Sequence, residues 1–199
     1  MKKVVIFDFD GVIVDSFDAA LKVAQMQRPA LTAQSYKEKF KGNIGKATYA
    51  EVLESPHIDF QTEYKKELLR LQIDEKKKKV LRLLSLEFDL HIISSTNSQS
   101  IKDFCEMQGV SECFADILGF DIEPSKVNKF RMIFDTYNLL PNDVAFVTDT
   151  VGDIEEARKA NVGTIIAVTD GFHSREELER AHPTHVIDSM VDLRALLLS

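Results

Sequence analysis

The hydrophobic pattern divides the chain into a short strand, a helical stretch and an alternating part. An apolar run from Val4 to Phe7 predicts a buried strand. From residue 19 to about residue 84, apolar residues recur at helical spacing and no run resembles a buried strand. We therefore predict that a helical insert follows the first strand. Turn-forming residues punctuate the insert at Pro29, Gly42, Gly45 and Pro56.

The rest of the chain alternates between strands and helices. Strands are predicted at residues 90–94, 115–118, 144–147, 164–168 and 185–187, and helices at residues 101–108, 127–137, 154–160 and 191–198. This alternation is typical of a parallel sheet covered by helices. The predicted fold is α/β, a doubly wound, Rossmann-like parallel sheet. Residues 1–15 and 80–199 form the predicted core, and residues 16–79 form the small helical insert.

Polar residues that can carry chemistry follow the predicted strands. In a doubly wound sheet, ligands bind outside the carboxyl ends of the strands. Two acids at the mouth of the buried first strand are electrostatically costly unless a metal or another cation is present. The strand ends and their loops therefore predict one site, and the residues placed there are Asp8, Asp10, Ser94, Ser95, Lys126, Asp149 and Asp153.

The first strand end carries a specific resemblance. The nine residues from Asp8 to Ser16, DFDGVIVDS, closely resemble the first motif of the haloacid dehalogenase superfamily of phosphohydrolases. The resemblance implies that Asp8 is the nucleophile that forms an aspartyl-phosphate and that Asp10 is the general acid/base. It also implies a Mg²⁺ cofactor held by Asp8, Asp10, Asp149 and Asp153, because Mg²⁺ prefers hard oxygen ligands.

The segment from Thr148 to Asp153 resembles the fourth motif of the same family. Asp149 is the expected direct metal ligand, and Asp153 is the expected water-mediated ligand. Asp153 is also a candidate N-cap for the helix that follows, and both roles can hold together. Glycine is common in the family where Thr148 stands, so a bulkier side chain here is expected to alter the local turn.

The second and third motifs leave alternatives open. Residues 91–97 resemble the second motif, in which a hydroxyl group binds the transferred phosphoryl group. We favour Ser94, with Ser95 beside it, while Thr96 takes the role if the strand runs longer. For the phosphate-binding lysine, Lys126 is favoured over Lys129 because it stands just before the predicted helix, although the Lys-Pro pair of many relatives is absent.

The insert resembles the helical cap that follows the first motif in one large branch of this family. Such caps close over the site and contact the substrate. The segment from Gly42 to Lys46 is interpreted either as a mobile edge of the cap or as an ordinary loop. The run from Glu75 to Lys79 is interpreted as a solvated helix face rather than a phosphate site. His173 is a candidate for the cleft edge, although a solvated loop position is preferred.

Composition narrows the possible partners. The net charge of −7 and the pI near 5.3 argue against nucleic acid, and no apolar run approaches the roughly 18 residues of a membrane helix. Cys105 and Cys113 form no metal or disulfide pattern, and the chain starts almost directly in a strand, so we expect a cytoplasmic protein without a signal peptide. The expected partner is a small phosphorylated metabolite, and the sequence does not fix the oligomeric state.

The predicted function is Mg²⁺-dependent hydrolysis of a small phosphate monoester. A sugar-phosphate mutase on the same core is the main alternative. The second alternative is a non-catalytic relative that serves as a binding or regulatory protein. The presence of both Asp8 and Asp10 favours an enzyme over that relative.

Overall fold

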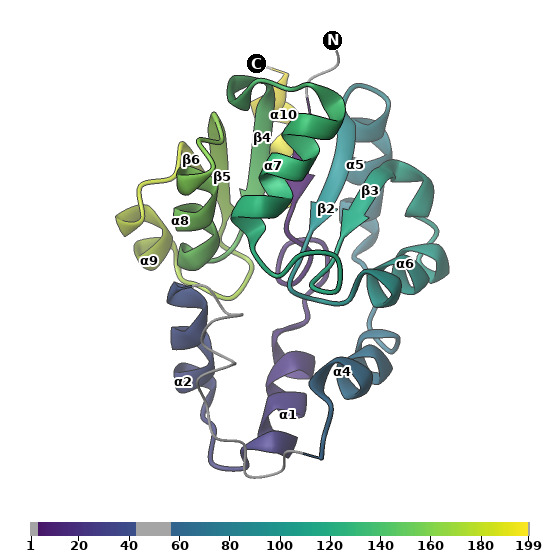
Figure 1. Cartoon of the computed structure of the whole chain (residues 1–199), viewed down its shortest axis with the longest axis vertical. Helices are drawn as coiled ribbons and strands as arrows, with labels where there is room; N and C mark the ends of the chain where they lie inside the picture. Colours follow the sequence, from purple (N-terminus) through teal and green to yellow (C-terminus); the bar gives the residue numbers. More distant parts are fainter. Residues whose placement is uncertain (1–3, 43–56, 199) are drawn as a thin grey trace.

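The computed structural model describes residues 4–42 and 57–198, and within them the chain forms one six-stranded parallel sheet. The strand order is β3-β2-β1-β4-β5-β6, the order of a doubly wound fold, which confirms the predicted fold class (Figure 1). The strands are β1 (Val4–Phe7), β2 (Asp89–Ile93), β3 (Phe114–Leu118), β4 (Val144–Thr148), β5 (Thr164–Val168) and β6 (His185–Ile187).

Strand β1 lies at the centre of the sheet, where the strand order reverses. Its last residue, Phe7, pairs with Ile92 of β2 and with Val147 of β4. The backbone N–H of Asp8 donates to the Val147 carbonyl at 2.8 Å, which extends the ladder by one residue. Since ligands bind at this switch point in doubly wound folds, the topology itself brings Asp8 to the ligand-binding edge beside the end of β4.

Helices bury the two faces of the sheet separately. The alternating side chains of β1 separate the two cores, with Val5 and Phe7 in one and Val4 and Ile6 in the other. The first face is covered by α5 (Glu75–Ser85), α6 (Ser98–Met107) and α10 (Leu193–Leu197), and the second by α7 (Lys126–Tyr137), α8 (Val151–Lys159) and α9 (Arg175–Arg180). Short 3-10 turns lie at η2 (Ser111–Cys113), η3 (Pro141–Asp143) and η4 (Met190–Asp192).

The helical insert lies beyond the carboxyl ends of the strands (Figure 1). It contains α1 (Phe17–Gln27), α2 (Ala33–Glu38), η1 (Lys39–Lys41) and α4 (Phe60–Leu68), and α1 packs against α4. Of the predicted Gly42 to Lys46 edge, only Gly42 belongs to the described residues. Residue 79, the predicted end of the insert, falls inside α5, which packs against β2. The division into core and cap stays a prediction.

The lysine run at the start of α5 is solvated at Lys76 and Lys79 but not at the two lysines between them. Lys77 and Lys78 are buried, and the Lys77 ammonium donates to the Val12 carbonyl at 2.8 Å and lies 3.2 Å from a carboxylate oxygen of Asp170. The predicted interpretation was wrong at these two positions, because the Lys77 amine reaches partners in the loops after β1 and β5 and Lys78 pairs with Glu75 on the same helix. Lys77 thus ties the loop that carries Asp10 to the loop after β5. Within the described residues, no helix is both long and apolar enough to cross a membrane.

Candidate active site

Asp8 leaves β1 with its carboxylate almost fully buried. Its Oδ1 accepts hydrogen bonds from the Lys126 ammonium and from the Phe9 backbone N–H, both at 2.8 Å. Burial raises the pKa of Asp8 well above its usual value, while the Lys126 charge opposes the rise. The carboxylate therefore depends on a cation to stay ionised.

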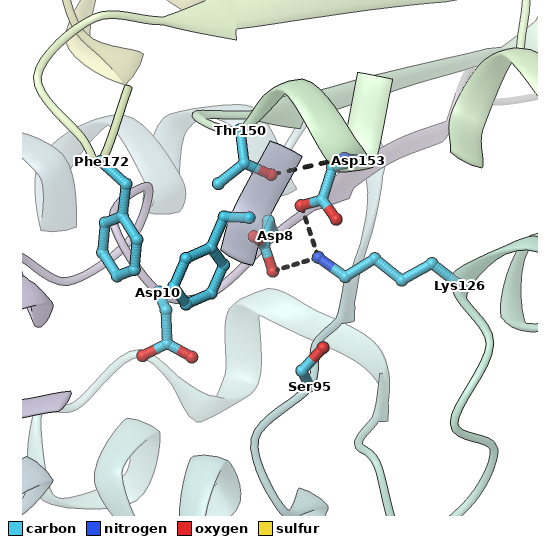
Figure 2. Close-up of a pocket in the computed structure, with 8 residues that line it drawn as sticks. Asp8, Asp10, Ser95, Lys126, Thr150, Asp153 and Phe172 are labelled. Carbon is cyan, nitrogen blue, oxygen red and sulfur yellow. Dashed lines mark hydrogen bonds and ion pairs between the residues drawn. The ribbon is translucent and has the colours of Figure 1, made fainter. Parts of the chain in front are cut away.

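Lys126 is the cation at the centre of this group (Figure 2). Its ammonium lies 2.8 Å from Asp8 Oδ1 and 2.6 Å from Asp153 Oδ2. Burial alone would lower the pKa of Lys126, but the two carboxylates outweigh it and raise the pKa. The alternative candidate, Lys129, is fully buried and donates to the Ser94 carbonyl instead. Of the two lysines, Lys126 is the one placed against the predicted nucleophile.

Asp153 is held by threonines as well as by Lys126. Thr148 Oγ1 donates to Asp153 Oδ2 at 2.9 Å, and Lys126 donates to the same oxygen. Burial favours the neutral acid, but Lys126 and these hydrogen bonds hold the pKa of Asp153 below its usual value. The N-cap of α8 is Thr150, whose hydroxyl accepts from the Asp153 N–H, so the predicted capping role of Asp153 was wrong. The side chain of Thr148 therefore has a use here: it fixes Asp153.

Asp149 lies at the end of β4 with no exposed surface. Its Oδ2 accepts a hydrogen bond from the Phe172 N–H at 2.7 Å, and its Oδ1 has no hydrogen-bond partner among the described residues. Burial raises the pKa of Asp149 to about 7. A Cβ atom at Gly11, whose φ is +77°, would lie 1.9 Å from Asp149 Oδ2, and one at Gly171 would lie 2.3 Å away. Only glycine lets these two loops close around the carboxylate.

Asp10 is surrounded by hydroxyl groups. Its Oδ1 accepts from Ser16 Oγ at 2.8 Å and from the Tyr64 hydroxyl, and its Oδ2 accepts from Thr96 Oγ1 at 2.7 Å. Figure 2 shows Asp10 apart from the Asp8, Lys126 and Asp153 group, with its carboxylate turned away from them. Asp10 lines the same pocket but holds none of the ion pairs there.

The three hydroxyl candidates after β2 have different surroundings. Ser94 is fully buried, and its Oγ accepts from the Thr96 N–H at 2.9 Å within the turn. Thr96 uses its hydroxyl on Asp10. Ser95 lines the pocket, and its side chain lies below Lys126 in the view of Figure 2. The structure thus places the second favoured serine, rather than the first, at the pocket.

The pocket itself is small and has an aromatic wall. Its cavity volume is about 30 Å³, enough to hold a few water molecules. On this wall the rings of Phe40 from η1 and Phe172 pack edge to face, with their centroids 4.9 Å apart. Neither residue was predicted from the sequence to line the site. The lining residues are Asp8, Asp10, Phe40, Ser95, Lys126, Thr150, Asp153 and Phe172.

His173 joins the insert to the core. It is 1% exposed, so the preferred prediction of a solvated loop histidine was wrong. Its Nδ1 accepts from the Val151 N–H at 3.0 Å, and its Nε2 lies 3.1 Å from the Lys37 carbonyl. Because Nδ1 accepts, Nε2 carries the proton and donates to Lys37. The imidazole thereby links the first turn of α8 to α2.

Two of the buried acids, Asp8 and Asp149, offer oxygen atoms that suit a magnesium ion. Among the residues with described positions, no three His, Cys, Asp or Glu side chains are grouped as a ready-made metal site. Magnesium needs only one or two carboxylates, since it keeps several waters and shares its shell with substrate phosphate. The buried, unpartnered Oδ1 of Asp149 and the nearby Asp8 carboxylate supply such oxygens.

Comparisons with known proteins identify the family of the chain. The family model for haloacid dehalogenase-like hydrolases matches residues 5–167. A phosphoglycolate phosphatase of Vibrio vulnificus is 25% identical, covering 98% of this chain and 96% of that protein, and one of Synechococcus elongatus is 26% identical, covering 95% and 94%. The solved structure of a haloacid dehalogenase-like hydrolase from Streptococcus pneumoniae has a TM-score of 0.83 at 20% identity and covers 98% of both chains. The family predicted from the sequence is confirmed, and the chain belongs to the haloacid dehalogenase-like hydrolases.

Proposed function

We propose that this chain is a Mg²⁺-dependent phosphatase that hydrolyses a small phosphate monoester through an aspartyl-phosphate on Asp8. One observation carries the proposal: Asp8, at the end of the central strand, shares the Lys126 ammonium with Asp153 in a pocket that Asp10 and Ser95 also line. The curated relatives are named phosphatases and match nearly their full length, which supports the reaction class.

In the first step, a carboxylate oxygen of Asp8 attacks phosphorus. The bond from Asp8 to phosphorus forms as the bond to the leaving oxygen breaks, and Asp10 gives its proton to that oxygen. Lys126 offsets the charge of Asp8 and of the phosphoryl oxygens, and Ser95 donates a hydrogen bond to one of them. Asp153 holds the Lys126 ammonium at this position.

In the second step, Asp10 removes a proton from water. The water oxygen attacks phosphorus, the bond from phosphorus to Asp8 breaks, and inorganic phosphate leaves. Asp10 is protonated again, and Asp8 is a free carboxylate. The two steps restore both side chains to their starting states.

Asp8 and Asp149 are the side chains that would hold Mg²⁺. The ion would offset the negative charge of the carboxylates and of the phosphoryl group. Asp153 Oδ2 already accepts from Lys126 and Thr148, and Asp10 already accepts from three hydroxyl groups. We therefore assign these two acids to the surroundings of the ion rather than to its direct carboxylate ligands.

The insert serves as a cap in this proposal. Phe40 of η1 forms part of the pocket wall over Asp8 and Lys126, so in this proposal the segment carrying Phe40 moves away to admit the substrate and returns before the reaction. The small, partly aromatic pocket favours a small leaving group. Phosphoglycolate is the first metabolite to assay, because the relatives at 25% and 26% identity bear that name.

The test compares phosphate release from 4-nitrophenyl phosphate with Mg²⁺ by wild type, Asp8→Asn and Asp18→Asn. Asp18 is an exposed acid on α1, so its variant matches the charge change away from the pocket. We expect turnover by wild type and by Asp18→Asn, and loss of at least a thousandfold in Asp8→Asn. Equal, negligible turnover in all three would refute an enzyme. An isomeric phosphate in place of inorganic phosphate from a sugar phosphate would identify a mutase.

A further inference from the structure

The insert reaches the predicted acid/base through one helix. Tyr64 of α4 is 1% exposed, and its hydroxyl donates to Oδ1 of Asp10. One turn earlier, Gln61 donates from Nε2 to the Ser95 carbonyl at 3.2 Å and accepts from the Asn97 N–H at 3.0 Å. Residues three apart lie on one helix face, so this face of α4 contacts the loops after β1 and β2 at once.

The hydrogen bonds to Asp10 distinguish its two oxygens. A carboxylate oxygen has two lone-pair positions. Oδ1 uses both, for Ser16 from the core and Tyr64 from the insert, while Oδ2 accepts only the Thr96 hydroxyl within the described residues. Oδ2 therefore keeps one position open, and it is the oxygen able to exchange a proton with substrate or water.

The surroundings of Ser16 and Tyr64 keep both hydroxyl groups bonded to Oδ1 of Asp10. Ser16 is the N-cap residue of α1, yet its hydroxyl bonds Asp10 rather than a backbone N–H of the helix. The Tyr64 ring stacks on the Phe60 ring, with the ring centroids 5.6 Å apart and an interplanar angle of 15°. Burial, followed by the Asp10 charge, raises the pKa of Tyr64 well above its usual value, so the hydroxyl keeps its proton and stays a donor.

We propose that Tyr64 is a positioning residue of the cap, which completes the hydrogen bonding of Asp10 Oδ1 and so directs Oδ2 to the leaving oxygen. The proposal rests on the function proposed above. Tyr64 neither gains nor loses a proton. The proton on Oδ2 passes to the leaving oxygen as the phosphorus–oxygen bond breaks, and Oδ2 later takes a proton from the attacking water. Lifting α4 removes the Tyr64 bond, so Asp10 is fully oriented only while the cap is docked.

The experiment compares two aryl phosphates of similar size in wild type and Tyr64→Phe. The value of kcat/KM covers the steps from free enzyme and substrate up to departure of the leaving group, so the comparison of two leaving groups reports on proton transfer to the leaving oxygen. Phenoxide needs that proton more than 4-nitrophenoxide, because 4-nitrophenol is the stronger acid. In Tyr64→Phe we expect kcat/KM to fall about tenfold for phenyl phosphate, equivalent to ~1.4 kcal/mol, and less than about threefold for 4-nitrophenyl phosphate.

Two further variants make the result decisive. Tyr137→Phe removes the same kind of bond, a tyrosine hydroxyl 2.5 Å from Asp116 on the protein surface, and is expected to change neither substrate's kcat/KM. Ser16→Ala removes the other donor to Oδ1 and is expected to shift the substrate ratio in the direction of Tyr64→Phe, which keeps the test valid if Tyr64→Phe fails to fold. Equal losses for both substrates, or none, would refute the role of Tyr64. Absence of wild-type turnover of both would instead refute the proposed phosphatase.

Discussion

Gly152 controls how closely the insert can approach the core. It is the second residue of α8, and its Cα faces the backbone of the segment that follows α2. A Cβ atom at this position would lie 2.3 Å from the Gly42 carbonyl oxygen and 2.7 Å from the Phe40 carbonyl oxygen. Since real Cβ contacts essentially never fall below 3.0 Å, Gly152→Ala forces the two backbones apart by at least about 0.7 Å.

This displacement is expected to lower activity without destabilising the core. A misplacement of about 1 Å at a reacting centre costs up to a hundredfold in rate, so we expect kcat/KM of Gly152→Ala to fall about ten- to a hundredfold. Alanine is favoured over glycine in a helix by roughly 0.5–1 kcal/mol, so the thermal unfolding midpoint should stay equal or rise slightly. Activity is therefore expected to fall while the unfolding midpoint does not.

The assay is steady-state hydrolysis of 4-nitrophenyl phosphate together with thermal unfolding followed by circular dichroism. Gly42→Ala is the matched control, because a Cβ atom on this other side of the contact meets nothing within 4 Å. We expect Gly42→Ala to retain wild-type kcat/KM. Full activity in Gly152→Ala, or a loss of activity that accompanies a lower unfolding midpoint, would refute the reasoning.

Three other changes test the site. Ser95→Ala is expected to lower kcat about tenfold, because it removes a hydroxyl group from the pocket. Ser94→Ala should instead lower the unfolding midpoint, with less effect on kcat. The reverse pattern would return the phosphate-binding role to Ser94. Lys126→Met leaves two buried carboxylates without their cation, so we expect ~3–5 kcal/mol of destabilisation by urea unfolding and no measurable turnover. Saturating Mg²⁺ at 100 times its Kd should stabilise wild type by ~2.7 kcal/mol, seen as a higher unfolding midpoint; an equal rise in Asp149→Asn would refute metal binding at Asp149.

The strand ends were predictable because short buried strands have strong sequence signals. Residues 164–168 form a mostly buried strand with the predicted bounds, and residues 185–187, predicted as a weaker strand, form a partly exposed one with the predicted bounds. Helix starts were less accurate, since polar first turns carry no apolar pattern. Helix α6 begins at Ser98, three residues before the predicted Ile101, because Asn97 caps it by accepting from the backbone N–H groups of Gln99 and Ser100.

The direction of each side chain within a turn could not be predicted from the sequence. Ser94, Ser95 and Thr96 are three adjacent hydroxyl residues, and one hydrogen bond from the Thr96 N–H to Ser94 Oγ leaves Ser95 to line the pocket. The buried lysine Lys77 was missed for a related reason, since its partners lie 65 and 93 residues away in the loops that carry Val12 and Asp170. Contacts between distant loops leave no local periodicity in the sequence.

Several contacts of the insert would couple cap closure to the chemistry proposed for the core. Phe40 and Gly42 meet Gly152 on α8, Gln61 binds the loop after β2, and Tyr64 binds Asp10. These contacts come from segments on either side of residues 43–56, so the two ends of the insert must dock together to form all of them. In the proposed mechanism, Asp10 would lack one donor to Oδ1 when the substrate enters an opened pocket, and proton transfer would wait until the insert has closed again and excluded water.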